Sequence, residues 1–363
     1  MIPMRTIRTL LVAAGFLGVI LSCRKTAVPE AVPVPAEKTY TVSLHVGGAA
    51  TLPTKLSGIY SPDESRIERW AYWVFDEAGW AIKCGTGDNS LQKDVTLLTG
   101  RYTVVVLANY PTSGIGSVPL NAGITQEALL GHTSELTSNS GNCFVMEGEK
   151  TINITEDAIS PIEVKVARLV SKVGVRKISV NYTNTRLNNK TTTLKGIYLT
   201  NLYRTSRYGS DYADSELDAT QSRWYNSMGW HRWSAEQISS GMDALVGESG
   251  LSIPISPASP HTQEHYFYCY PNPSRPENDT HDTTTWSVRS TRLVIETDVD
   301  GKTFYYQVQL PAMRRNTPYV ASEVVIRDLG STDPEAFIPG TLDVILSTDI
   351  LGWEGSYSID EES

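Results

Sequence analysis

Residues 161–180, PIEVKVARLVSKVGVRKISV, decide the fold class, because they hold two runs in which apolar and polar residues alternate. A period of two places the apolar side chains on one face of a β-strand. No linker sequence separates the two runs. The stretch therefore predicts consecutive strands that open a second domain, and we place the domain boundary between Ser160 and Pro161.

Similar strand patterns recur on both sides of this stretch. Residues 39–46, TYTVSLHV, alternate in the same way, and residues 101–109, RYTVVVLAN, are rich in β-branched side chains. The shorter run 95–98 precedes the latter, which predicts a hairpin. Asp300 and Gly301 stand between two apolar runs and favour a tight hairpin turn. Short strands with turn residues between them predict an all-β fold of two tandem β-sandwiches.

The strand pattern is interrupted in two places. Residues 125–134 are the one helix candidate of the first half. Residues 203–260 lose the strand pattern, which predicts a long loop region inside the second domain. The predicted organisation is a signal peptide at 1–22, a proline-rich tether at 23–38, and β-sandwich domains at 39–160 and 161–363.

The N-terminus has the features of an export signal. Arg5 and Arg8 precede an apolar run over 10–20, which is too short to span a bilayer comfortably. The run ends in Leu21, Ser22 and Cys23, which resembles the bacterial lipoprotein signal and implies cleavage between Ser22 and Cys23 with lipidation of the Cys23 thiol. At about 0.8 kcal/mol per buried methylene, two or three acyl chains hold a protein almost irreversibly. The expected location is the outer membrane and cell surface; a secreted protein or a transmembrane anchor are the alternatives.

Composition narrows the function classes. The chain of 363 residues has a formal net charge of −9, which argues against a nucleic-acid partner. After lipidation of Cys23, three cysteines remain, so at most one disulfide can form and the sequence does not say between which of them: Cys84, Cys143 and Cys269. Their spacing matches no zinc motif.

Motifs that carry catalysis are missing from the sequence. It contains neither a phosphate-binding loop nor a Gly-x-Ser-x-Gly nucleophile motif. The carboxylate pair Asp63 and Glu64 is interpreted as loop charge. His261 and His265 lie four apart, but Thr262 replaces the Glu that a zinc protease needs, and nearby prolines disfavour a helix. The sequence predicts a protein that is not an enzyme and has neither a metal nor a cofactor.

Four aromatic residues in the expected loop region are candidates for surface contacts. Exposed Trp and Tyr side chains stack on sugars or anchor a protein partner. The alternative is that they pack the loop against its own domain. The residues are Trp224, Tyr225, Trp230 and Trp233.

Several segments, in order along nearly the whole chain, resemble the fimbrillin family of Bacteroidales, the lipoprotein precursors of pilus subunits. Each motif alone is degenerate, but the ordered set is specific. The segments are WVFD at 73–76 with Gly79, GRYTVVVLAN at 100–109, ARLVSKV at 167–173, FYCYPN at 267–272, and Arg315, Asn316, Tyr319, GSTDPE at 330–335 and Trp353.

The resemblance implies two transthyretin-like sandwiches and a structural or adhesive pilus subunit. Family members lose their lipidated first strand to a trypsin-like protease, and an extended strand of another subunit fills the groove. Here the first strand is 39–46, the candidate cleavage residues are Lys55 and Arg66, and the candidate donor lies within 341–363. An uncut subunit would remain a lipidated anchor. The rival interpretation is a glycan-binding outer-membrane surface lipoprotein of a nutrient-uptake system.

Polar residues within the family-like motifs carry expectations of their own. Arg168 and Lys172 lie between inward-facing apolar positions, so we expect their stems to cover sheet surface while their charged ends reach solvent. Asn109 and Asn272 stand at strand ends, where a short amide can bond the backbone of its own turn.

Overall fold

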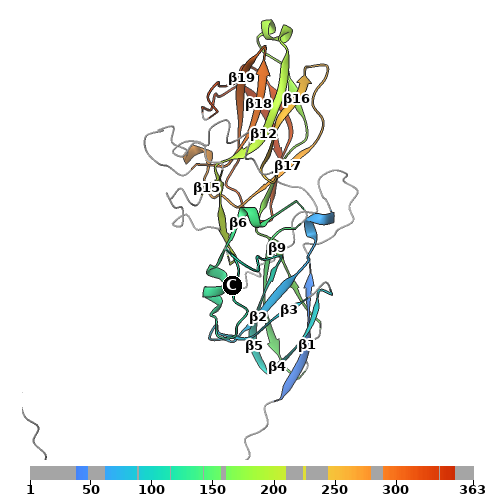
Figure 1. Cartoon of the computed structure of the whole chain (residues 1–363), viewed down its shortest axis with the longest axis vertical. Coiled ribbons are helices and arrows are strands. Elements are labelled where there is room, and N and C mark those ends of the chain that lie inside the picture. Colours follow the sequence, from blue (N-terminus) through green and yellow to red (C-terminus); the bar gives the residue numbers. More distant parts are fainter. Residues whose placement is uncertain are drawn as a thin grey trace, which may run out of the picture. The chain divides into compact units, whose positions relative to one another are not determined.

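The computed structural model describes residues 38–47, 62–87, 90–114, 116–141, 143–156, 161–209, 224–225, 244–278, 289–334 and 336–347. Strands dominate these ranges, whose one α-helix is α1 (Gln126–Gly131), so the all-β fold class is confirmed (Figure 1). The helix is shorter than the expected 125–134. It begins after Thr125, whose side chain accepts a hydrogen bond from the Ala128 backbone N–H, and Thr133–Glu135 form strand β6 instead.

Most strands before residue 170 belong to two sheets. In the first, β1 (Thr39–Gly47) is the middle strand, antiparallel to β4 (Gln92–Leu98) and parallel to β8 (Ile162–Lys165). The second has the order β3-β2-β5-β7-β9, with bounds Ala81–Gly87, Trp70–Phe75, Gly100–Ala108, Met146–Ile154 and Ala167–Arg168.

The expected hairpin of 95–98 with 101–109 is wrong. β4 pairs with β1 and β5 pairs with β2 and β7, so the chain changes sheets at residues 98–100. Apolar alternation reports which side of a strand is buried, and it does not report which strand lies alongside. Two strands that cross between layers therefore have the same sequence pattern as a hairpin.

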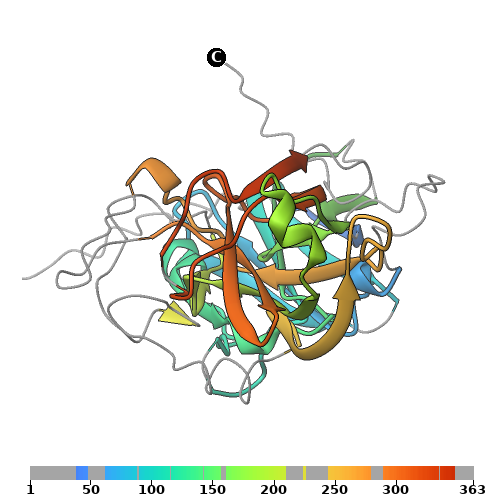
Figure 2. The same ribbon diagram turned by 90° about the horizontal axis from the view of Figure 1, so that it is seen from above.

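The residues after 170, coloured green to red in Figures 1 and 2, form two further large sheets, besides two-stranded pairings. One has the order β11-β20-β10-β17, with β21 paired to β20. The other has the order β16-β12-β18-β19. The bounds, in chain order from β10 to β12 and from β16 to β21, are Ser171–Val175, Ile178–Val180, Thr192–Thr200, Gly247–Ile255, His265–Cys269, Arg292–Val299, Lys302–Gln309, Pro318–Ile326 and Leu342–Ser347.

The expected turn at Asp300 and Gly301 is confirmed. The two residues connect β18 to β19, and their φ angles are 52° and 82°. Positive φ at both central residues is the type I′ geometry, whose twist matches that of the flanking strands. Local turn chemistry therefore sets the register of this hairpin.

The 203–260 stretch is not a continuous loop. It contains β14 (Thr205–Arg207), which pairs with β6, and the nine-residue strand β16. Pro254 and two glycines obscure the strand pattern of β16 in the sequence. Proline is tolerated there because β16 is an edge strand, paired only with β12 among the described residues.

The sheet partners change between Arg168 and Ser171. β8 and β9 follow Pro161 in the chain but pair with β1 and β7. The domain limits at 160 and 161 stay a prediction, whereas the pairing places the change of sheets two short strands later, after β8 and β9. Within the described ranges, no helix has the length and the apolar character that crossing a membrane requires.

Candidate functional site

The first strand is held from both sides. β1 exchanges backbone hydrogen bonds with β4 and β8, and its alternate residues Val42, Leu44 and Val46 are buried, with 1%, 0% and 5% of their surface exposed. The alternation seen in the sequence thus points into the core. Removing this strand would open a groove in the middle of a sheet, with unpaired backbone on both walls.

A buried ion pair connects the segment after the first strand to the second half. Glu64 lies in the short 3₁₀ helix η1 (Pro62–Ser65), ahead of β2, and Lys172 lies in β10. The Lys172 ammonium is 2.7 Å from Glu64 Oε1, and the two side chains are 1% and 3% exposed. The Tyr268 hydroxyl donates a second hydrogen bond to the same oxygen, also at 2.7 Å.

Aromatic rings surround the Lys172 ammonium. Its nitrogen lies 4.3 Å from the centroid of the Tyr266 ring and 5.8 Å from that of Tyr268, within cation–π range. A Cβ on Gly174 would come within 2.6 Å of the Tyr266 ring, so glycine is what leaves room for it. Burial lowers the pKa of Lys172, and the adjacent Glu64 charge opposes that shift.

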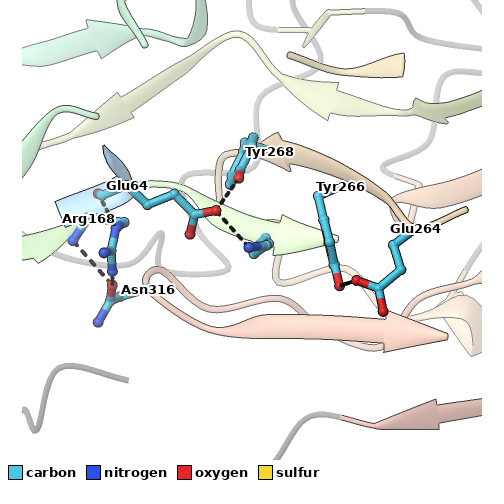
Figure 3. A network of polar contacts seen from close by, with 7 residues as sticks. Glu64, Arg168, Glu264, Tyr266, Tyr268 and Asn316 are labelled. Atoms are coloured by element: carbon cyan, nitrogen blue, oxygen red, sulfur yellow. Dashed lines mark hydrogen bonds and ion pairs between the residues drawn. The ribbon is translucent and has the colours of Figure 1, made fainter. Parts of the chain in front are cut away.

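Arg168 holds the same segment through the backbone of Glu64. Its Nε donates to the Glu64 carbonyl oxygen at 2.8 Å, and its Nη1 donates to Asn316 Oδ1 at 3.1 Å (Figure 3). Arg168 and Lys172 are 0% and 1% exposed, so the expectation that their charged ends reach solvent is wrong. The reason is a carboxylate and a carbonyl supplied from more than a hundred positions away, which spacing cannot reveal. We refer to Glu64, Arg168, Lys172, Tyr266, Tyr268 and Asn316 as the junction cluster.

Asn109 fixes the residues that follow Glu64. It has a φ of 55°, and its Nδ2 donates to the carbonyl oxygens of Arg66, at 2.7 Å, and Phe144, at 2.9 Å. Its Oδ1 accepts from the Glu68 N–H at 2.9 Å, and its own N–H donates to the Arg69 carbonyl oxygen at 2.9 Å. The amide therefore bonds a distant segment, whereas Asn272 also bonds its own turn at Ser274, as expected.

A second ion pair connects the residues before 170 with those after it. Arg315 Nη1 lies 3.4 Å from Glu147 Oε2, and it also donates to the Tyr208 carbonyl oxygen at 2.8 Å. Glu147 is 4% exposed, and burial raises its pKa from 4.5 to about 7, although the Arg315 charge acts in the opposite direction.

We expect Glu147→Gln to change how stability depends on pH. Because the folded state holds a proton on Glu147 that the unfolded state has released, this group contributes stability below pH 4.5 that is lost as the pH rises to about 7. Chemical denaturation should show the wild type losing up to about 1 kcal/mol per pH unit relative to the variant across that window. Exposed Glu77→Gln is the control, and parallel curves for wild type and Glu147→Gln would contradict the assignment.

The structure locates only some of the residues singled out in the sequence. Ser22, Cys23, Lys55, Trp230 and Trp233 lie outside the described residues. The backbones of Trp224 and Tyr225 form β15, which pairs with β13 (Leu202–Tyr203). Of the donor candidate 341–363, Leu342–Ser347 form β21 at the edge of its sheet, and residues 348–363 lie outside the described ranges.

The fold brings His261 and His265 together, and the two rings are joined by a hydrogen bond. Their Nε2 atoms are 2.7 Å apart, and Nδ1 of His265 lies 3.2 Å from a Glu248 carboxylate oxygen. Burial and the neighbouring His265 lower the pKa of His261, which favours the neutral form of His261. The described residues contain no group of three or more His, Cys, Asp or Glu placed to hold a metal, and the free thiols are Cys84, Cys143 and Cys269.

Comparison with known proteins gives matches in structure alone. Neither a protein-family model nor a curated protein sequence matches the chain. A proposed cell adhesion protein from Parabacteroides distasonis ATCC 8503 aligns with a TM-score of 0.58 at 15% identity, over 88% of this chain and 100% of that chain. The fimbrilin FimA from Porphyromonas gingivalis W83 aligns with a TM-score of 0.53 at 14% identity, over 84% and 96%. A proposed cell adhesion protein from Bacteroides eggerthii DSM 20697 aligns with a TM-score of 0.54 at 17% identity, over 86% of this chain and 95% of that chain.

These alignments cover most of both chains, so the whole two-sandwich arrangement is shared and not one domain of it. At such identities the likeness establishes the fold. It confirms, at the level of the fold, the resemblance to fimbrillins that the sequence motifs indicate.

Proposed function

We propose that this chain is a non-enzymatic subunit of a cell-surface pilus, structural or adhesive, that is exported as a lipoprotein on Cys23 and assembles by strand exchange. The observation that carries the proposal is the position of β1. It is the central strand of its sheet, it is paired on both edges, and it is the first strand of the described chain. Its loss would leave a groove that another extended segment can fill with the same backbone hydrogen bonds.

The fold shared with fimbrilin supports the same proposal. The partners would be other pilus subunits, through the groove, and the outer membrane, through the lipid. β21 suits the role of donor better than any inner strand, because β20 is its one pairing partner among the described strands. Its residue Ile345 is 62% exposed, an apolar side chain available to a second surface.

Retention of β1 would change the role of the subunit. An uncut chain keeps the strand together with the lipid on Cys23 and would serve as a membrane anchor instead of a shaft subunit. The hydrogen bonds to the carbonyl oxygens of Glu64 and Arg66 disfavour a cut after Arg66. A chain that is not cut ahead of Glu64 would therefore keep β1 and serve as an anchor.

Polymerisation of the purified precursor tests the proposal. Limited trypsin treatment should remove β1 and give a ladder of oligomers on a denaturing gel without boiling, and a chain that ends at Gly340 should give cut monomers only. Mass spectrometry of the native N-terminus reports lipid retention and cleavage together. A precursor that loses β1 and stays monomeric at high concentration would contradict strand exchange.

A further inference from the structure

We infer that residues 64–69 remain in the mature subunit, so that any processing cut falls ahead of Glu64. We refer to these residues as the brace. Asn109 protects the peptide bonds after Arg66 and Arg69 from cleavage. The inference deepens the proposed function, on which the existence of a processing cut rests. It also excludes Arg66, one of the two candidate cleavage residues that the sequence suggests.

The side chain of Arg66 alone would make a good protease site. It is 55% exposed, and among the described residues its ion-pair partner is Glu68, at 3.3 Å on the surface. A trypsin-like protease, however, needs more than the side chain. It binds its substrate as an extended strand, and the carbonyl oxygen of the bond to be cut must enter the oxyanion hole.

Both carbonyl oxygens in question are already bonded. The Arg66 oxygen accepts from Asn109 Nδ2 and the Arg69 oxygen from the Asn109 N–H. On the other side of Arg66, the Glu64 carbonyl accepts from Arg168 and the Glu64 carboxylate from Lys172 and Tyr268. The chain around Arg66 is therefore held at Glu64, Arg66, Glu68 and Arg69, and it must detach locally before a protease can bind it.

Loss of the segment would also harm the product. A cut after Arg66 would release Glu64 together with β1, and the Lys172 ammonium would then lie buried without this counter-ion. A cut ahead of Glu64 removes β1 and leaves the junction cluster complete. Only the second product keeps the contacts of Glu64 with Lys172, Tyr268 and Arg168.

Limited proteolysis of the full precursor tests this directly. Trypsin under native conditions should give a large fragment whose intact mass includes Glu64, and the termini Ile67 and Trp70 should be absent. In Asn109→Gly, which keeps the positive φ but lacks the amide, cleavage after Arg66 should become about tenfold faster or more, because two hydrogen bonds that close the segment are lost. Asn109→Asp can still accept from the Glu68 N–H, and it removes the two bonds that Nδ2 donates to the carbonyl oxygens of Arg66 and Phe144.

A folded native fragment that begins at Ile67 or Trp70 would overturn the inference. Should Asn109→Gly fail to fold, Arg66→Gln decides the matter. Its native fragments should match those of the wild type, while its fragments in urea should differ. The proposed function fails separately, since a chain protected at Arg66 that never polymerises refutes strand exchange and leaves the brace intact.

Discussion

Glu64→Gln is expected to lower the free energy of unfolding by about 3–5 kcal/mol at pH 7, because it leaves the Lys172 ammonium buried beside a neutral amide. This loss in the free energy of unfolding should become smaller as the pH rises. Burial already lowers the pKa of Lys172, and without the Glu64 charge the folded state releases its proton still earlier than the unfolded state does. Urea denaturation between pH 7 and pH 10 measures both effects.

Two further variants separate the buried charge from other causes. The double variant of Glu64→Gln with Lys172→Met should recover part of the loss, because it removes the buried Lys172 ammonium, while the Arg168 guanidinium stays buried. Glu323→Gln breaks a partly exposed ion pair with Lys177, at 2.8 Å, and should cost at most about 1 kcal/mol. A Glu64→Gln protein within 1 kcal/mol of the wild type at pH 7 would show that the ion pair does not hold the junction.

Leu44→Ala is expected to destabilise the precursor by about 2–5 kcal/mol, because Leu44 is fully buried in the middle of β1. The processed polymer should be unaffected, since under the proposed function the strand is no longer in it. Chemical denaturation of the precursor and heat resistance of the polymer on a denaturing gel give the two values.

Thr41→Ala is the matched control for Leu44→Ala. It lies in the same strand but is exposed, with a hydroxyl contact to Thr96 across to β4, and should change the precursor by less than about 0.5 kcal/mol. Polymers of Leu44→Ala that melt as early as its precursor would mean that β1 is retained in the assembled state.

The sequence predicts those parts of the fold that depend on local chemistry. The alternation over 39–46 identifies β1 and its buried face, and Asp300 with Gly301 identifies a type I′ hairpin, since both signals act over a few residues. Pairing between distant strands is a different matter. The alternation that identifies β4 and β5 says nothing of the two separate sheets in which they lie.

The junction cluster could not have been found in the same way. Glu64 has the sequence context of a loop charge, and its partner Lys172 stands 108 positions further along. Lys172 in turn has the context of a solvated residue on an alternating strand. Each becomes unusual only when the fold brings them together, because a buried charge must be matched by whatever lies next to it in space. The nearest sequence signal is the ARLVSKV motif, which places two cations among apolar residues.

The arrangement of the junction has a mechanical consequence for a fibre of such subunits. Tension would enter each subunit at the groove of β1 and leave it at β21, and between these points the chain passes from the first pair of sheets to the second once, at residues 169–170. The force is shared there between this covalent connection and non-covalent contacts that include Glu64 with Lys172, Arg168 with Asn316, Arg315 with Glu147, and the pairing of β6 with β14. These contacts can break and re-form without chemical change, so the junction would be the place where a pulled fibre lengthens and then recoils.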